Sequence, residues 1–216
     1  MKCYVDANPD TLPIILSLEN HCSHHFQAVI ADILTNTLKD RLYIPEESSG
    51  PLPSPLDLVG KVCIKGKRPP ENDDDEFPIS ASESDDEEGL DPESALKSGP
   101  STKSDIPLPQ IFPELARLTL FNGVKFTGFS TSIRLKGTDM HSFNETKIMK
   151  VLNNDTTNAT EKWKQYNKDH MTRTYPAGSR VDSSNYNPVV SWHVGSQLVA
   201  LNFQTEDSEM TINAGR

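Results

Sequence analysis

Apolar residues are gathered in short runs, and the first of these predicts a strand. The stretch LPIILSLE (residues 12–19) is almost continuously apolar, which is typical of a parallel strand covered on both faces. It ends on the polar residues Glu19, Asn20 and His21. Apolar positions then recur every three or four residues over residues 24–42, which predicts a helix with one apolar stripe.

A second helix and strand are expected before the chain changes character. In PLPSPLDLVG (residues 51–60), Ser54 followed by Pro55 has the pattern of a helix N-cap with proline in the first turn. The following KVCIKGK (residues 61–67) has the length and composition of a strand.

The pattern resumes near residue 115 with the same alternation of types. LARLTLFNGVKF (residues 115–126) predicts a strand, and SFNETKIMKVL (residues 142–152) predicts a helix opened by a capping box of Ser142 and Glu145. A polar helix is expected at residues 161–170, a turn-rich loop at 173–188, a short helix at 189–195 and a buried strand at 197–205.

The alternation of strands and helices predicts an α/β fold with a parallel sheet and right-handed crossovers. In a (β/α)₈ barrel, chemistry is carried at the carboxyl ends of the strands. Glu19 ends one expected strand, and Lys65 and Lys67 end another. Polar groups are therefore found where such a barrel would have its active site.

Composition divides the chain into three parts. Only 35% of the 216 residues are hydrophobic, and twelve acids but one base fall within residues 71–97. The remaining residues carry 19 acids and 20 bases, so the segment carries a net charge of −11 and the rest of the chain +1. Because it cannot bury enough apolar surface to offset the entropy of ordering, we expect residues 69–112 to form a disordered acidic linker between ordered parts at 1–68 and 113–216.

Cysteine usage and the absence of long apolar runs favour an intracellular protein. Cys3, Cys22 and Cys63 form neither an even set nor a CxxC pair, which favours free thiols. No stretch resembles a signal peptide or is apolar over the length of a membrane span.

Basic residues cluster at the end of the second strand. Lys65, Lys67 and Arg68 place three cations around Gly66, where the backbone can approach a ligand closely. A Walker phosphate loop is excluded, because the spacing from Gly60 is one residue too long and Arg68 replaces the required Ser or Thr. Residue chemistry alone leaves open an anion site or a solvated basic turn.

Further candidate residues are scattered over the second half of the chain. Arg173 and Tyr175 precede Pro176 in an expected loop, and Ser142 heads an expected helix whose N–H groups could hold a phosphate. A surface cation would equally explain Arg173, and a simple N-cap would explain Ser142. A purely structural explanation is weaker for Glu19, because a carboxylate that closes an apolar strand must be paired, hydrogen-bonded or metal-bound.

Three longer stretches resemble one enzyme family. LPIILSLENHCS, LPSPLDLVGKVCIKGKR and above all RTYPAGSRVDSSNYNPVVSWHVGSQLVALNFQT are similar to the eukaryotic phosphoinositide-specific phospholipases C. The first two match the end of the family's X region, and residues from about 115 onward match the start of its Y region. The acidic segment falls where the family has its variable X–Y linker.

The resemblance implies a (β/α)₈ barrel, here incomplete and interrupted by the linker. It also implies Ca²⁺-dependent hydrolysis of phosphatidylinositol 4,5-bisphosphate to diacylglycerol and inositol 1,4,5-trisphosphate. By position in the motifs, Glu19 resembles a calcium ligand, and Lys65, Lys67, Ser142 and Arg173 resemble ligands of the ring phosphates. Tyr175 resembles the aromatic residue that lies against the inositol ring.

The resemblance also indicates what this chain lacks. The family's reaction needs two histidines, and both belong to parts of the X region that would precede residue 1, so we expect a fragment without catalytic residues. Two classes remain open: part of a phospholipase C, or a non-catalytic phosphoinositide-binding or regulatory module. The discriminating observation is whether the genomic sequence upstream of Met1 encodes the missing histidines.

The resemblance and the composition also lead to expectations for the behaviour of the protein. The chain alone should be inactive and poorly folded. Its partner should be a phosphoinositide-containing membrane, with cytoplasmic location, transient contact with the inner face of the plasma membrane, and no nucleic acid; the upstream regulator is not indicated. In the complete enzyme, the acidic segment should inhibit by competing for the basic, phosphate-binding end of the barrel.

Overall fold

The computed structural model describes residues 1–46, 52–69, 111–153 and 158–215 and contains one parallel sheet. Six strands lie in the order β1-β2-β3-β4-β5-β6, and every neighbouring pair is parallel. The predicted disordered linker falls almost wholly at residues 70–110, outside the described residues. No helix of the described part is long and apolar enough to cross a membrane.

The elements alternate along the chain as a β/α fold requires. The first half contains α1 (Lys2–Ala7), β1 (Ile14–Ser17), α2 (His24–Leu38), the 3₁₀ turn η1 (Lys39–Arg41), β2 (Val62–Gly66), α3 (Pro113–Arg117) and β3 (Thr119–Gly123). The second half contains α4 (Phe129–Ser132), β4 (Asp139–Asn144), α5 (Glu145–Leu152), α6 (Ala159–Tyr166), β5 (Thr172–Tyr175), α7 (Val189–His193), β6 (Leu198–Val199) and α8 (Ser208–Ala214).

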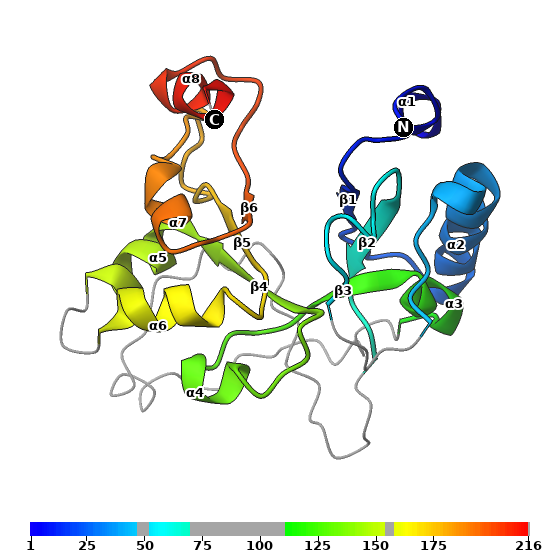
Figure 1. Cartoon of the computed structure of the whole chain (residues 1–216), viewed down its shortest axis with the longest axis horizontal. Helices are drawn as coiled ribbons and strands as arrows, with labels where there is room; N and C mark the ends of the chain where they lie inside the picture. Colours follow the sequence, from blue (N-terminus) through cyan, green and yellow to red (C-terminus); the bar gives the residue numbers. More distant parts are fainter. Residues whose placement is uncertain (47–51, 70–110, 154–157, 216) are drawn as a thin grey trace, which may run out of the picture.

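The sheet curls into an incomplete barrel with helices along its outer face. Helices α2 and α3 lie beside β1 and β2, whereas α5, α6 and α7 lie beside β4 and β5 (Figure 1). Strand β3 joins the two groups, and it pairs with β4 only at Asn122–Asp139 and Gly123–Met140. The predicted fold class, an incomplete (β/α)₈ barrel, is confirmed.

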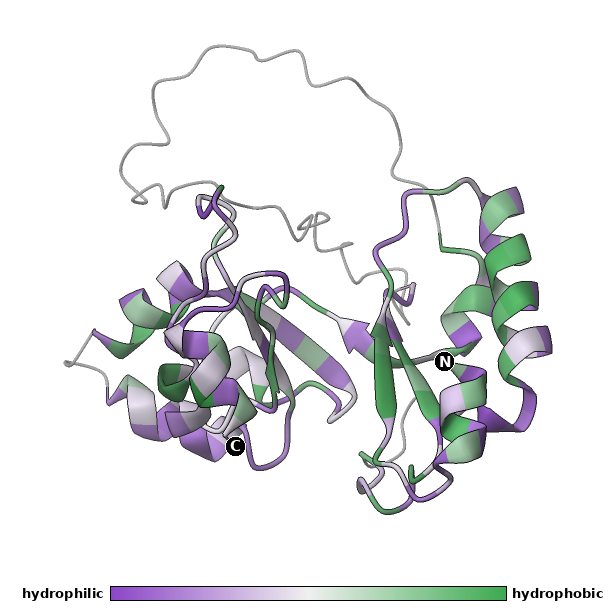
Figure 2. Cartoon of the chain, turned by 90° about the horizontal axis from the view of Figure 1, so that it is seen from above, coloured by the Kyte–Doolittle hydropathy of each residue, from purple (hydrophilic) through white to green (hydrophobic). Residues whose placement is uncertain are grey.

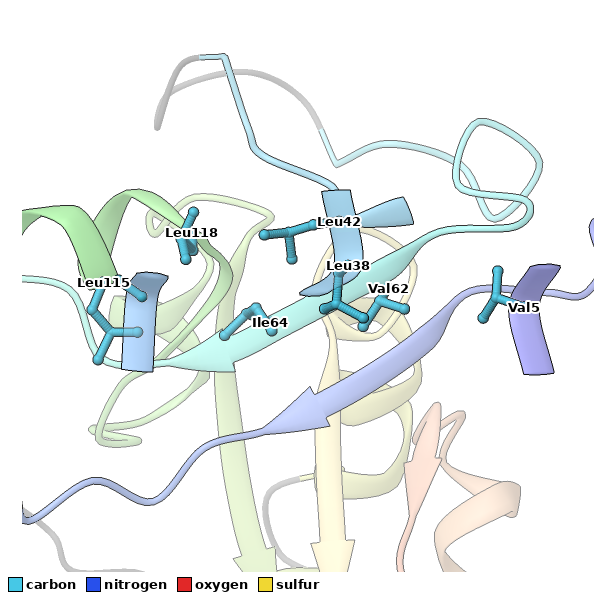
Figure 3. Close-up of a cluster of buried hydrophobic side chains, with 8 residues drawn as sticks. Val5, Leu38, Leu42, Val62, Ile64, Leu115 and Leu118 are labelled. Atoms are coloured by element: carbon cyan, nitrogen blue, oxygen red, sulfur yellow. The ribbon is translucent and has the colours of Figure 1, made fainter. Parts of the chain in front are cut away.

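Alternation along the strands separates an outer core from an inner one. In β2, Val62 and Ile64 pack with Leu38 and Leu118 in a cluster between the sheet and helices α2 and α3 (Figure 3). Cys63 points to the opposite face, because successive strand side chains alternate, and it packs in a cluster inside the curl of the sheet. This inner cluster includes residues of β1, β2, β3, β4 and β6 and the residue before β5; its buried members are Leu58, Cys63, Leu120, Phe121 and Met140, and Ile15, Met171 and Leu198 pack against them.

Helix α2 is amphipathic but keeps much apolar surface in water. Its buried residues include Ala31 and Leu38, which contact the outer core. Phe26 and Ile33 are each 58% exposed. The helix is accordingly hydrophobic along much of its length (Figure 2).

Several predicted elements are correct in type but not in extent. The helix expected at 24–42 is α2 with η1, and the strand expected at 61–67 is β2. The strand expected at 12–19 is β1, but it is only half-buried rather than covered on both faces, because it lies at the edge of the sheet. The polar helix expected at 161–170 is α6, which starts and ends earlier, and the run at 197–205 contributes only the two residues of β6.

One predicted element is wrong, and another is correct in type but too long. Residues 55–60 form successive turns rather than a helix, although Ser54 Oγ does accept a hydrogen bond from Asp57 N at 3.3 Å. In the stretch 115–126, only Thr119–Gly123 is a strand, because Pro113 begins a short helix that ends at Arg117.

The capping box at Ser142 is also wrong. Ser142 lies within β4, and the N-cap of α5 is Asn144, whose side chain accepts a hydrogen bond from Lys147 N at 2.8 Å. Glu145 does not reach back to Ser142 but binds Arg180. Likewise, Arg173 and Tyr175 lie in strand β5, not in a loop.

Candidate functional site at the carboxyl ends of the strands

Strand periodicity places the predicted site residues on the inner face of the sheet. Each lies two or four positions beyond a residue of the inner core: Glu19 beyond Ile15, Lys65 and Lys67 beyond Cys63, Ser142 beyond Met140, and Arg173 and Tyr175 beyond Met171. Side chains two apart on a strand share a face, and parallel strands end at the same edge. The six residues therefore form one inward-facing layer at the carboxyl ends of β1, β2, β4 and β5.

The ammonium groups of Lys65 and Lys67 both lie close to Gly123. A β-carbon placed on Gly123 would lie 3.7 Å from Lys67 Nζ and 3.8 Å from Lys65 Nζ. Lys67 Nζ donates to Gly123 O at 2.9 Å, and Lys65 Nζ donates to Ser17 Oγ at 3.3 Å. Lys65 is only 4% exposed, so the site holds a charge largely removed from water, which favours a bound anion.

Arg68, the third cation of the predicted basic cluster, points elsewhere. Its Nη2 donates to Thr138 Oγ1 at 2.9 Å, and its backbone N donates to Asn122 Oδ1 at 2.9 Å. Asn122 Nδ2 in turn donates to Asp139 Oδ1 at 3.0 Å. These contacts connect the ends of β2, β3 and β4 where β3 and β4 pair at only two positions, so Arg68 has a structural role.

Ser142, Arg173 and Tyr175 are brought together by the pairing of β4 with β5. Ser142 is the register partner of Arg173, and Asn144 is the partner of Tyr175. The Arg173 guanidinium lies 5.0 Å from the centre of the Tyr175 ring, a cation–π contact. The sheet thus presents a hydroxyl, a guanidinium and an aromatic face side by side, a set that can hold a phosphate and the ring that bears it.

A salt bridge fixes the loop that follows β5. Arg180 donates to both carboxylate oxygens of Glu145, with Nη2 2.7 Å from Oε2, and Ala177 N donates to Glu145 Oε1 at 2.9 Å. Burial alone would raise the pKa of Glu145, but the hydrogen bonds from Arg180 and Ala177 outweigh it and hold the pKa below its ordinary value. Because Glu145 follows β4 directly, this clamp joins the two strand ends that carry Ser142, Arg173 and Tyr175.

Glu19 lies at the same edge but not in a formed metal site. Its side chain is 54% exposed, and Oε1 lies 3.1 Å from His21 Nε2. The residues that the structure describes contain no group of three or more His, Cys, Asp or Glu placed to hold a metal ion. Calcium takes six to eight oxygen ligands, so the donors around Glu19 do not fit a complete calcium site.

The remaining histidines lie away from this layer. His141 is fully buried on the outer face of β4, where Nδ1 donates to Val124 O at 3.0 Å and burial lowers its pKa. His170 stacks on Tyr166 with ring centres 4.4 Å apart. His24 and His25 belong to α2, and His193 is exposed at the end of α7.

The inner core beneath the site offers no nucleophile. Burial raises the pKa of the Cys63 thiol to about 11, so it stays protonated at neutral pH. All three cysteines are free, as predicted.

Sequence reasoning missed Gly123, Asn144, Glu145 and Arg180 as parts of the site. The indications of their roles in the sequence were weak. Gly123 is a glycine near the end of a strand, and Glu145 and Arg180 are charged residues at the start of a helix and in a turn. Only the N-x-x spacing from Asn144 to Lys147 could have indicated the true N-cap.

Two family models match the chain. Residues 2–68 match the model described as "Phosphatidylinositol-specific phospholipase C, X domain", and residues 115–216 match "Phosphatidylinositol-specific phospholipase C, Y domain". The matched stretches thus lie on either side of the acidic segment.

Similar proteins of known name belong to the same family. The chain is 34% identical over 94% of its length to human 1-phosphatidylinositol 4,5-bisphosphate phosphodiesterase delta-1, covering 28% of that protein. It is also 34% identical over 94% of its length to human "Inactive phospholipase C-like protein 2", covering 18% of it. It thus spans about a quarter or less of these relatives.

Among solved structures, the fold is similar to the crystal structure of S. officinalis PLC21. The TM-score is 0.73 and the identity 31%, over 99% of this chain and 26% of that one. The crystal structure of L. pealei PLC21 gives a TM-score of 0.72 at the same identity.

Proposed function

Because the chain belongs to the phosphatidylinositol-specific phospholipase C family, we propose that its strand-end layer binds the phosphorylated inositol ring of phosphatidylinositol 4,5-bisphosphate. The observation that carries the proposal is the approach of Lys65 and Lys67 around Gly123. Both ammonium groups lie within 4 Å of one point beside Gly123, so an anion at that point is attracted by two positive charges at once.

The other members of the layer complement this role. Arg173 can donate two parallel hydrogen bonds to a second phosphate, and Ser142 can donate one from its hydroxyl. Tyr175 offers an apolar face to the C–H surface of the ring. Recognition of a bisphosphorylated ring is thus distributed over β2, β4 and β5.

We further propose that this layer serves Ca²⁺-dependent hydrolysis of the lipid to diacylglycerol and inositol 1,4,5-trisphosphate in a phospholipase C. Glu19 would supply one calcium carboxylate, and the membrane site would be the inner face of the plasma membrane, reached from the cytoplasm. The chain by itself should not hydrolyse the lipid, because loss of one acid–base group slows catalysis by about 10²–10⁴-fold, and among the described histidines only His21, which contacts Glu19, lies beside the inward-facing layer.

A non-catalytic phosphoinositide-binding module is the second candidate. One relative at 34% identity bears the name "Inactive phospholipase C-like protein 2", so membership of the family does not by itself carry activity. Such a module would keep the phosphate ligands at β2, β4 and β5 without turnover.

Binding of inositol 1,4,5-trisphosphate to the purified chain, measured by isothermal titration, tests the proposal. Lys67→Gln and Arg173→Gln should each weaken binding by roughly tenfold, the loss expected for one charge-assisted hydrogen bond. Lys39→Gln, an exposed lysine of η1, is the matched control and should bind like the wild type. Equal affinity in all four proteins would refute a phosphate site at the strand ends.

A second measurement addresses turnover. Mixed micelles containing phosphatidylinositol 4,5-bisphosphate and calcium should release no inositol trisphosphate with the purified chain. Calcium-dependent release above that of a Lys65→Met, Arg173→Gln protein would show that the chain carries its own catalytic groups.

A further inference from the structure

A second basic site lies on the outer face of the barrel. A cavity of about 350 Å³ is lined by residues of α4, α5 and α6, and Phe143 of β4 packs against these helices. The three helices are labelled in Figure 1. Its volume is within the range of pockets that hold small ligands. We call it the helical pocket and define it by Phe129, Ser130, Lys147, Lys150, Val151, Ala159 and Lys162.

The charged part of the helical pocket is entirely basic. Lys147 and Lys150 come from α5 and Lys162 comes from α6, and the described lining contains no carboxylate. Neither Lys150 nor Lys162 has a side-chain hydrogen bond or ion pair in the part of the chain that the structure describes. The nearby acid of α6, Glu161, is engaged by Lys164 at 3.0 Å.

All three lysines are exposed, and they surround one cavity from two neighbouring helices. Lys147 and Lys150 are three residues apart on α5, so they lie on one face of that helix, and Lys162 faces them from α6. The exposed charges of Lys150 and Lys162 on neighbouring helices repel each other, and solvent screens part of this repulsion. An anion between them removes this repulsion.

The rest of the lining is a hydroxyl and an apolar wall. Ser130 supplies a hydrogen-bond donor, whereas Phe129, Val151 and Ala159 provide apolar surface. Phe129 is held in place by an edge contact with the buried Trp163, with ring centres 5.8 Å apart.

From this combination we propose that the helical pocket binds a phosphate ester whose organic part is small and apolar next to the phosphate. Three ammonium groups and a hydroxyl match the oxygens of a phosphate, and the apolar wall matches the attached group. The ligand is either a soluble phosphate monoester or the phosphate of an anionic lipid.

The helical pocket is separate from the strand-end layer. Lys147 lies 5.5 Å over the ring of Phe143, which points from β4 toward the outer helices. Ser142, the neighbouring residue of β4, points to the opposite face of the sheet. The two sites can therefore be tested independently, and the helical pocket does not depend on the proposed phospholipase function.

Phenyl phosphate is the soluble probe, because it joins a phosphate to an apolar ring. Binding is measured by isothermal titration in the full chain carrying K67Q and R173Q, which removes ligands of the strand-end layer. The test variant adds K147Q, K150Q and K162Q. The matched control adds K39Q, K61Q and R117Q, which remove the same charge from η1, the residue before β2 and α3. Circular dichroism checks that both fold alike.

Vesicles of phosphatidylcholine with phosphatidic acid are the second probe, measured by co-sedimentation. We expect saturable binding of at least one probe that falls by about tenfold or more in the test variant and is unchanged in the control. Loss with phenyl phosphate identifies a soluble ester as sufficient, and loss with vesicles alone identifies a lipid phosphate. Equal binding by the test and control variants, or no saturable binding of either probe, overturns the proposal.

A Val151→Asp protein gives an independent check on the position of the site. It places a carboxylate in the apolar wall while keeping all three lysines. It should weaken binding as strongly as the triple lysine change, whereas unchanged binding would show that the ligand contacts the lysines outside the cavity and would overturn the proposal.

Discussion

Gly123 is the residue on which the strand-end layer depends most directly. Its missing side chain leaves open the space that both lysine ammonium groups approach, and a β-carbon there would also lie 3.4 Å from Gly66 O. An alanine therefore fits the backbone without a severe clash but occupies the space between the cations. The position is a test of the phosphate site that leaves every charge in place.

We predict that Gly123→Ala weakens binding of inositol trisphosphate by roughly tenfold, the loss expected for one displaced charge-assisted contact. The thermal midpoint should stay near that of the wild type. Gly215→Ala, at an ordinary φ of −84° beside α8, serves as the control. Wild-type affinity in the Gly123→Ala protein, measured by isothermal titration, would place the bound phosphate elsewhere.

At the scale of single elements, two nearby residues at the junction of β4 with α5 have different roles, one structural and one in binding. Asn144 caps α5, whereas Ser142 points from β4 into the barrel. We predict that Asn144→Ala lowers the free energy of unfolding by about 1 kcal/mol, the usual cost of a lost N-cap. Ser142→Ala should leave the unfolding energy nearly unchanged in urea titrations but weaken inositol trisphosphate binding. A loss of unfolding energy in Ser142→Ala but not in Asn144→Ala would show that Ser142 is the N-cap of α5.

The clamp between α5 and the loop after β5 gives a pH-dependent prediction. The pKa of Glu145 is lower in the folded chain than in the unfolded chain, where it is about 4.3. The clamp therefore stabilises the fold above that pH, and its contribution is lost as the pH falls through the lower, folded-state pKa. Glu145→Gln should thus be destabilised by about 1–3 kcal/mol at pH 7, and the difference from wild type should shrink at pH 3.

The Glu145→Gln comparison needs a control that keeps the charge. Arg180→Lys retains a cation but cannot form two parallel bonds to the carboxylate. Its free energy of unfolding at pH 7 should therefore lie between those of the wild type and of Glu145→Gln. A difference from wild type that stayed constant between pH 7 and pH 3 in urea titrations would show that the carboxylate charge does not stabilise the loop.

For the whole molecule, exposed strand edges and apolar surface govern behaviour in solution. β1 and β6 lie at the two ends of the described sheet, and Leu12, just before β1, is 64% exposed. Unpaired edges and the exposed apolar face of α2 favour association with other copies. We therefore predict concentration-dependent self-association by analytical ultracentrifugation.

A charge at the edge should reduce this association. Leu12→Lys adds a cation beside β1, a common means of blocking edge pairing. Val181→Lys adds the same charge in a loop at a residue that is 94% exposed, and it should leave association unchanged. A wild-type chain that stays monomeric at every concentration tested would contradict the prediction.

Much of the fold was accessible from the sequence because local patterns carry it. The helix α2 and the strands β1 and β2 were predicted from apolar spacing alone, and the alternation of elements indicated a parallel sheet. β4 and β5 were missed, because their outward-facing residues include His141, Thr172 and Thr174, which are polar but buried. Thr174 Oγ1 meets the Tyr186 hydroxyl at 2.7 Å, a partner that lies beyond the strand and leaves no local signal.

The candidate site was likewise indicated partly by the sequence and decided partly by the tertiary structure. The residue types and their two-residue spacings, Lys65 with Lys67 and Arg173 with Tyr175, were visible in the chain, and they determined which chemistry is present. Which face each side chain takes was decided by the inner core, because a strand side chain shares the face of the residue two positions before it. The meeting of both lysines at Gly123, the pairing of Ser142 with Arg173 and the clamp of Glu145 on Arg180 join residues from different strands and loops. Only the curl of the sheet brings these residues together, since contacts between distant parts of a chain depend on packing and register rather than on local pattern.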